Sequence, residues 1–91
     1  MSMLPATVTV SPDLLAQELD GETVLLDLKT ERYYVLDDVG TRMWQLLSTL
    51  RDPDAVCGHL LAEYEIDEAT LRHDLAQLIG KLAAAGMIQV A

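Results

Sequence analysis

The hydrophobic pattern of this chain changes its period once, near Asp37, and this change constrains the fold more than any other feature. Before it, apolar and polar residues alternate, and Val24, Leu26 and Leu28 stand two positions apart. Such alternation is typical of a β-strand with one buried face, so we expect these three side chains to point into the core. After Asp37, apolar residues recur every three or four positions, as on an amphipathic helix. The sequence therefore predicts a sheet followed by helices.

Three strands are expected before the change of period. Residues 7–10 alternate threonine and valine, residues 24–28 form the second strand, and residues 32–36 form the third. We expect a hairpin turn at residues 29–32 and one antiparallel meander built from the three strands. Residues 11–19, between the first two strands, are expected to form a short helical turn or irregular coil.

Aspartates mark the starts of three helices. Asp37 or Asp38 can cap the first, Asp52 precedes Pro53 at the start of the second, and Asp67 can cap the third. Each carboxylate would accept hydrogen bonds from backbone N–H groups that a helix leaves unpaired in its first turn. We therefore expect three consecutive helices.

The apolar positions of these helices indicate how they pack. The first helix is expected to lie on the sheet with Trp44 as a core anchor, the second to end near Tyr64, and the third to stop at Gly86, before a short closing strand in residues 87–90. The apolar stripes are Val39, Met43, Leu46, Leu47 and Leu50 in the first helix and Leu71, Leu75, Leu78 and Leu82 in the third. The predicted fold class is α+β, a winged helix-turn-helix with a three-stranded antiparallel sheet followed by three helices.

Size and cysteine content set the class of protein. We expect the 91 residues to form a single domain, residues 1–91. The single cysteine, Cys57, excludes an intramolecular disulfide and suits a reducing compartment. The N-terminal residues lack the basic start and apolar run of a secretory signal, and no segment has the roughly 20 apolar residues needed to span a bilayer. We therefore expect a soluble, cytoplasmic protein.

The charge balance argues against nucleic acid as the partner. Fifteen acidic residues oppose six basic ones, for a formal net charge of -9. A DNA-binding domain needs a concentrated basic surface, whereas the basic residues here are scattered among acids. Acidity also keeps small domains soluble, so it does not identify a partner by itself.

The sequence offers no catalytic constellation. Cys57 and His59 are two positions apart on a predicted helix and so point to different sides, and His73 lies on another helix. These three residues do not have the paired spacing of a zinc site, and the five glycines form no phosphate-binding loop. We expect no metal, no cofactor and no enzymatic activity, with Cys57 as a small buried hydrophobe.

The segment Val24 to Leu47, a hairpin that leads directly into an amphipathic helix, resembles the corresponding segment of PqqD-like proteins. These are small domains that bind the leader segments of ribosomally made peptide precursors, and lasso-peptide pathways contain them as short stand-alone chains. Glu31 departs from the family pattern, which usually has glycine near this position. The resemblance implies a leader-peptide recognition element without chemistry of its own. Its implied partners are the precursor leader peptide, a transglutaminase-like cysteine leader peptidase and an ATP-dependent lasso cyclase.

The resemblance also implies a binding groove between the third strand and the third helix. The outer edge of a sheet offers unpaired backbone groups that can pair with an extended peptide, which is called β-strand addition. The candidate peptide-binding residues are Arg32, Tyr33, Tyr34, Val35 and Leu36 on the strand, and Leu71, Arg72, Asp74, Leu75, Leu78 and Lys81 on the helix. Strand alternation puts Tyr34 and Leu36 on one face, expected to be the core, and makes Tyr33 the better ligand candidate.

Two other functions are compatible with this architecture. A winged-helix DNA-binding regulator would share the fold, but its third helix should be basic, whereas here Arg72, His73 and Lys81 stand among Asp67, Glu68 and Asp74. A structural dimerisation module could use the same sheet edge against a second copy.

Overall fold

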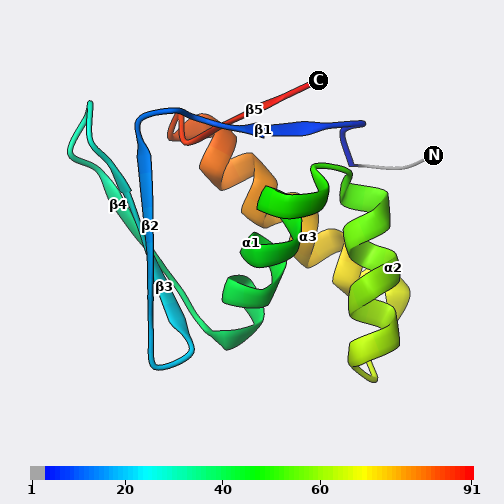
Figure 1. The fold of residues 1–91 in the computed structure, drawn as a ribbon. Helices are drawn as coiled ribbons and strands as arrows, with labels where there is room; N and C mark the ends of the chain where they lie inside the picture. The colour runs from blue at the N-terminus through cyan, green and yellow to red at the C-terminus, as the bar shows by residue number, and fades with distance from the viewer. Residues whose placement is uncertain (1–3) are drawn as a thin grey trace.

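The computed structural model describes residues 4–91. Within them the elements are β1 (Val8–Val10), β2 (Leu14–Leu19), β3 (Glu22–Asp27), β4 (Tyr33–Leu36), α1 (Asp38–Leu50), α2 (Pro53–Glu63), α3 (Glu68–Ala84) and β5 (Ile88–Val90). Strands β2, β3 and β4 form a sheet beside the three helices, and β1 and β5 run together across one end of the molecule (Figure 1). The predicted three-stranded antiparallel sheet followed by three helices is confirmed for these residues.

The identity of one strand in that sheet was predicted wrongly. Residues 8–10 do not join the meander but pair with β5, which confirms the closing strand. The third strand of the sheet is β2, in the segment expected to be a helical turn or coil. Apolar and polar residues do not alternate along β2, and only Leu14 is partly buried. The strand conformation of β2 therefore depends on its pairing with β3. Asp20 and Gly21, with φ of 54° and 79°, form the two-residue turn of this hairpin.

The facing of β3 is also the opposite of the prediction. Thr23, Leu25 and Asp27 are buried, whereas Val24 and Leu28 are exposed. The buried polar groups on this face are hydrogen-bonded. The Thr23 hydroxyl donates to the Thr41 hydroxyl at 2.9 Å, and the Asp27 carboxylate accepts from the backbone N–H groups of residues 29 and 30. Because these groups have partners, their burial costs little, and the apolar residues are left on the outer face.

The helix boundaries agree with the predicted caps. Asp37 accepts from the Gly40 N–H at 2.7 Å, and Asp52 and Asp67 cap α2 and α3 in the same way. Gly86, with φ of 75°, follows the end of α3. The local sequence signals thus predicted where each helix begins and where α2 and α3 end.

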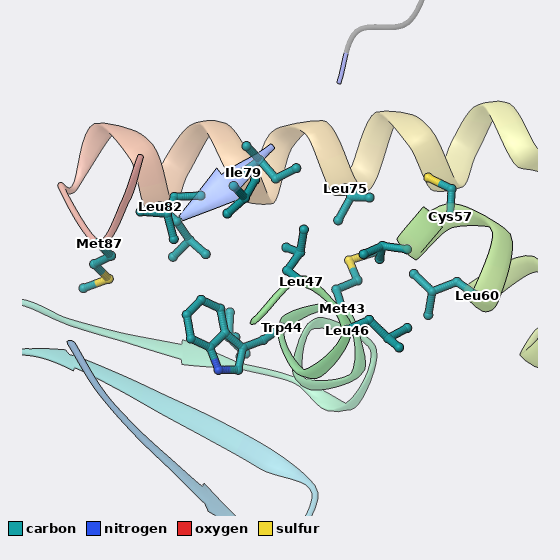
Figure 2. Close-up of a cluster of buried hydrophobic side chains, with 14 of the residues drawn as sticks. Met43, Trp44, Leu46, Leu47, Cys57, Leu60, Leu75, Ile79, Leu82 and Met87 are labelled. Atoms are coloured by element: carbon teal, nitrogen blue, oxygen red, sulfur yellow. The ribbon is translucent and has the colours of Figure 1, made fainter. Parts of the chain in front are cut away.

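One core lies between α1, α2 and α3 and the inner face of the sheet. Figure 2 shows Leu75, Ile79 and Leu82 of α3 pointing toward Leu47 of α1. Trp44 is 5% exposed and Cys57 is fully buried, as predicted. No helix within residues 4–91 is long and apolar enough to cross a membrane. The expectation about a secretory signal rests partly on residues 1–3, which lie outside the described residues.

Candidate functional site

The outer edge of β4 leaves backbone groups unpaired. Tyr34 and Leu36 are opposite Leu25 and Thr23 of β3, and the Asp27 N–H donates to the Arg32 carbonyl at 2.8 Å. Hydrogen-bonded pairs alternate in an antiparallel ladder, so Tyr34 and Leu36 bond to β3. The N–H and C=O groups of Tyr33 and Val35 therefore point away from the sheet.

A groove separates this edge from α3. Its cavity volume is about 550 Å³, which is large enough for several side chains of a ligand. The strand side and the start of α1 contribute Tyr34, Val35, Leu36, Asp37, Val39, Gly40 and Met43, and the α3 side contributes Ile66, Asp74, Gln77, Leu78 and Lys81. The groove thus combines an open strand edge with a helical wall.

A smaller cavity of about 220 Å³ adjoins the groove. It shares Val39 and Ile66 with the groove and is otherwise lined by Leu60, Tyr64, Glu65 and Leu71. Most of these side chains are apolar, so the cavity suits a large apolar side chain of a ligand. It lies at the end of the groove where β4 leads into α1.

The structure brings together six of the eleven candidate residues from the sequence. These are Tyr34, Val35, Leu36, Asp74, Leu78 and Lys81. Leu75 is fully buried in the core, and Leu71 lines only the smaller cavity. Tyr33 lies on the outer face of the sheet with 68% exposure, and Tyr34, expected to be core, also lines the groove. Arg32 directly precedes β4 and is exposed.

Arg72 does not lie on the groove. Its guanidinium forms ion pairs with Asp54 at 2.7 Å and Glu68 at 3.2 Å, which hold it against α2 and raise its pKa. The groove face of α3 instead carries residues 74, 77, 78 and 81, which follow the spacing of one helical face. Arg72 falls outside that spacing. The helical period therefore identifies the charged residues beside the groove, Asp74 and Lys81, and excludes Arg72.

Several lining residues were not predicted to bind the peptide. The sequence indicates Gly40 only as the joint between strand and helix, and a Cβ there would lie 3.1 Å from Asp37 Oδ1 and 3.3 Å from Leu36 Cβ. A side chain at this position would crowd the joint between β4 and α1 and fill part of the groove. Ile66 and Gln77 gave no sequence signal, because which elements meet at the groove depends on the tertiary fold.

The groove is lined by groups that can bind a ligand. Among the described residues, no group of three or more histidine, cysteine or acidic side chains could hold a metal ion. Burial raises the pKa of the Cys57 thiol, which disfavours the reactive thiolate. The chemistry available along β4 and α3 is backbone hydrogen bonding, apolar contact and charge on the rim.

Comparison with known proteins identifies relatives of this fold. The family model for coenzyme PQQ synthesis protein D (PqqD) matches residues 22–88. The structure of TbiB1 in complex with the TbiA(beta) leader peptide has 33% sequence identity and a TM-score of 0.83, and the match covers 89% of this chain and 94% of that one. Lasso peptide synthetase B1 complexed with the leader peptide has 28% identity and a TM-score of 0.82, with 92% and 99% covered. The search of curated proteins gave no significant match.

Proposed function

Because this chain belongs to the PqqD family, we propose that it is a leader-peptide recognition element of lasso-peptide biosynthesis. It binds the leader of a precursor peptide by β-strand addition and presents the precursor to a leader peptidase and a lasso cyclase, without catalysing a reaction itself. The observation that carries the proposal is the open edge of β4 facing α3 across a groove. The similar structures of TbiB1 and lasso peptide synthetase B1 are both complexes with leader peptides.

The size of the expected affinity indicates which contacts matter. Tyr33 and Val35 each offer one N–H and one C=O, and a backbone hydrogen bond contributes about 0.5–1.5 kcal/mol net. These bonds alone fall short of the roughly 8 kcal/mol that a micromolar dissociation constant requires. Apolar ligand side chains packed against Tyr34, Met43 and Leu78 must supply much of the remainder. The edge sets the ligand conformation, and the groove sets most of its affinity.

Presentation to enzymes requires a second surface, and the outer face of the sheet is suited to this role. It carries a contiguous set of exposed or partly exposed apolar side chains, in which Leu15, Leu26 and Tyr33 form one cross-strand row and Val24 and Val35 another. Such patches on small domains commonly mark interaction sites. A strand bound at the β4 edge would lie beside this face, so an enzyme docked there would meet both the domain and the peptide.

Titration calorimetry tests the proposal. A synthetic peptide with the leader sequence of the precursor encoded beside this gene should bind 1:1 with a dissociation constant in or below the micromolar range, about 8 kcal/mol or more. The core part of the same precursor should add little affinity. Binding to the core alone, or to neither part, would contradict the proposed function.

A further inference from the structure

Within residues 4–91, some basic residues form ion pairs and others do not. The ion pairs of residues 4–91 involve only Arg42 and Arg72, which bind Glu63, Asp54 and Glu68 away from the groove. Of the other basic residues, Lys29 and Arg32 flank the β3–β4 turn and Lys81 lines the groove. These cations are therefore available to a ligand.

The groove has a defined polarity because β4 and α3 run in opposite directions. Near the C-terminal end of α3, the Met87 carbonyl accepts from the Ser11 N–H at 2.9 Å, and the nearby Asp13 carbonyl accepts from Leu28 beside the β3–β4 turn at 2.9 Å. The tip of that hairpin and the C-terminal end of α3 both lie toward the top of Figure 1. At the opposite end, Val39 of α1 and Ile66 before α3 line the same cavities.

The two ends of the groove consequently carry opposite charges. Lys81 lies on α3 toward the hairpin end, the end at which Arg32 directly precedes β4, whereas Asp74 lies two helical turns earlier, about 10.5 Å along α3. Asp37 lines the groove at the same end as Asp74, where β4 leads into α1. An extended peptide covers this span in about three residues, so a single strand can reach both ends.

We propose that this groove selects peptides whose basic residues precede their acidic residues in the bound strand. This rests on the proposed function and adds a charge order to it. The sheet is antiparallel throughout, and an added antiparallel strand would begin beside Asp37 and Asp74 and end beside Arg32 and Lys81. A basic side chain then meets the acidic end and an acidic side chain meets the basic end. The open edge bonds any sequence, so these rim charges discriminate one charge order from the reverse.

The expected size of this charge preference depends on how exposed the charged groups beside the groove are. Asp74 and Lys81 are exposed, and exposed ion pairs are individually weak and screened by salt. Reversing the charge order of a peptide removes two attractions and creates two repulsions, so we expect about a threefold to tenfold loss of affinity at low ionic strength. The effect should decrease in 0.5 M salt, at which the Debye length is only about 4 Å.

A phage-displayed library of random 12-residue peptides tests the charge order without knowledge of the natural ligand. Peptides selected on the wild-type chain should carry basic residues before acidic ones. The double variant Asp74→Lys/Lys81→Glu keeps Asp37 and Arg32, so each end of its groove holds one acidic and one basic group, and it should select neither charge order. The control Glu22→Lys/Arg51→Glu makes the same charge changes outside the groove lining and should select the wild-type order. Circular dichroism confirms that each variant is folded.

The outcomes separate this inference from the proposed function. For one enriched peptide and its charge-reversed version, calorimetry at low salt should give the threefold to tenfold difference. Equal affinities, or the same charge order selected by the groove double variant, would overturn the charge rule while leaving peptide binding intact. Failure of the library to yield any peptide that binds at the β4 edge would overturn the proposed function, and the charge rule with it.

Discussion

The sheet has two open edges, β2 and β4, and the groove described above lies along β4. Both expose backbone groups, and β2 is the longer, with six residues against four in β4. By the same alternation, the N–H and C=O groups of Ala16 and Glu18 point away from β3. Leu14 follows the same alternation, but its N–H donates to the Ser11 carbonyl at 3.2 Å. Yet β2 contributes no residue to the groove or to the smaller cavity beside it. We therefore expect a peptide to pair with β4, where α3 provides a second wall, rather than with β2.

The β2 edge also has a feature that discourages pairing. The Glu18 carboxylate accepts a hydrogen bond of 2.9 Å from the Gln45 side chain of α1, which holds a charged group on the edge strand. Charged side chains on edge strands are a common protection against unwanted strand addition. On β4, the acidic residue nearest to α1 is Asp37, which follows the strand and caps α1. The edge of β4 itself therefore carries no acidic side chain.

The largest expected effect concerns the sheet that supports both edges. Leu25→Ala should lower the free energy of unfolding by about 2–5 kcal/mol, because Leu25 is fully buried beneath the sheet. Val24→Ala, one residue away on the outer face with 39% exposure, should cost less than about 1 kcal/mol. Urea denaturation followed by circular dichroism measures both. Equal losses would mean that β3 does not face the core as described.

The next prediction compares the two edges directly. Val35→Pro removes an outward N–H from the β4 edge, where proline does not disturb the β3 ladder, and should weaken leader binding by about 2–3 kcal/mol, or roughly 30-fold to 150-fold. Ala16→Pro makes the matched change on β2 and should leave affinity unchanged. Calorimetry on both folded variants decides between the edges. A larger loss from Ala16→Pro would assign the peptide to β2.

A smaller effect separates the two faces of β4. Tyr34 lines the groove, so Tyr34→Ala should reduce leader affinity about tenfold, or 1.4 kcal/mol. Tyr33→Ala removes a side chain from the outer face and should change affinity by less than about threefold while leaving the domain folded. If Tyr33→Ala had the larger effect on affinity, the ligand would contact the outer face of the sheet.

The smallest effect concerns the ion pair between α1 and α2. Arg42 donates two hydrogen bonds of 2.8 Å to Glu63 and holds the pKa of that carboxyl below its usual range. Since the folded-state pKa is the lower one, the pair stabilises the fold above the unfolded pKa of about 4.3 and loses this contribution as pH falls through the folded value. Glu63→Gln should therefore unfold at slightly lower urea concentration than wild type at pH 7, with a difference that shrinks below about pH 4. A difference that grows on acidification would contradict this assignment.

The sequence predicted the features that depend on neighbouring residues. The helix caps at Asp37, Asp52 and Asp67 were predicted because a cap needs only a carboxylate two or three residues from free N–H groups. The positive φ of Glu31, 62°, likewise follows from a turn position at which the family usually has glycine.

Features that depend on tertiary contacts were predicted less well. The facing of β3 was inverted because Val24 and Leu26 are more apolar than Thr23 and Asp27, and the sequence does not show that Thr41 and the turn amides would satisfy the polar pair. Strand β2 was missed because its residues have no buried face, although the Asp20–Gly21 turn pointed to a hairpin. The family resemblance predicted that the groove lies between the third strand and the third helix. Which α3 residues line it became clear only from the structure, which shows the face of α3 that borders the groove.

Hydrogen exchange of backbone amides, measured by NMR with and without the leader peptide, tests the use of the β4 edge most directly. The amides of Tyr33 and Val35 should exchange more slowly in the complex, as should alternate amides of the peptide, because they become hydrogen-bonded to each other. The amides of Leu14, Ala16 and Glu18 on β2 should exchange as in the free protein. Unchanged exchange at Tyr33 and Val35 in a saturated complex, or new protection on β2, would contradict the account.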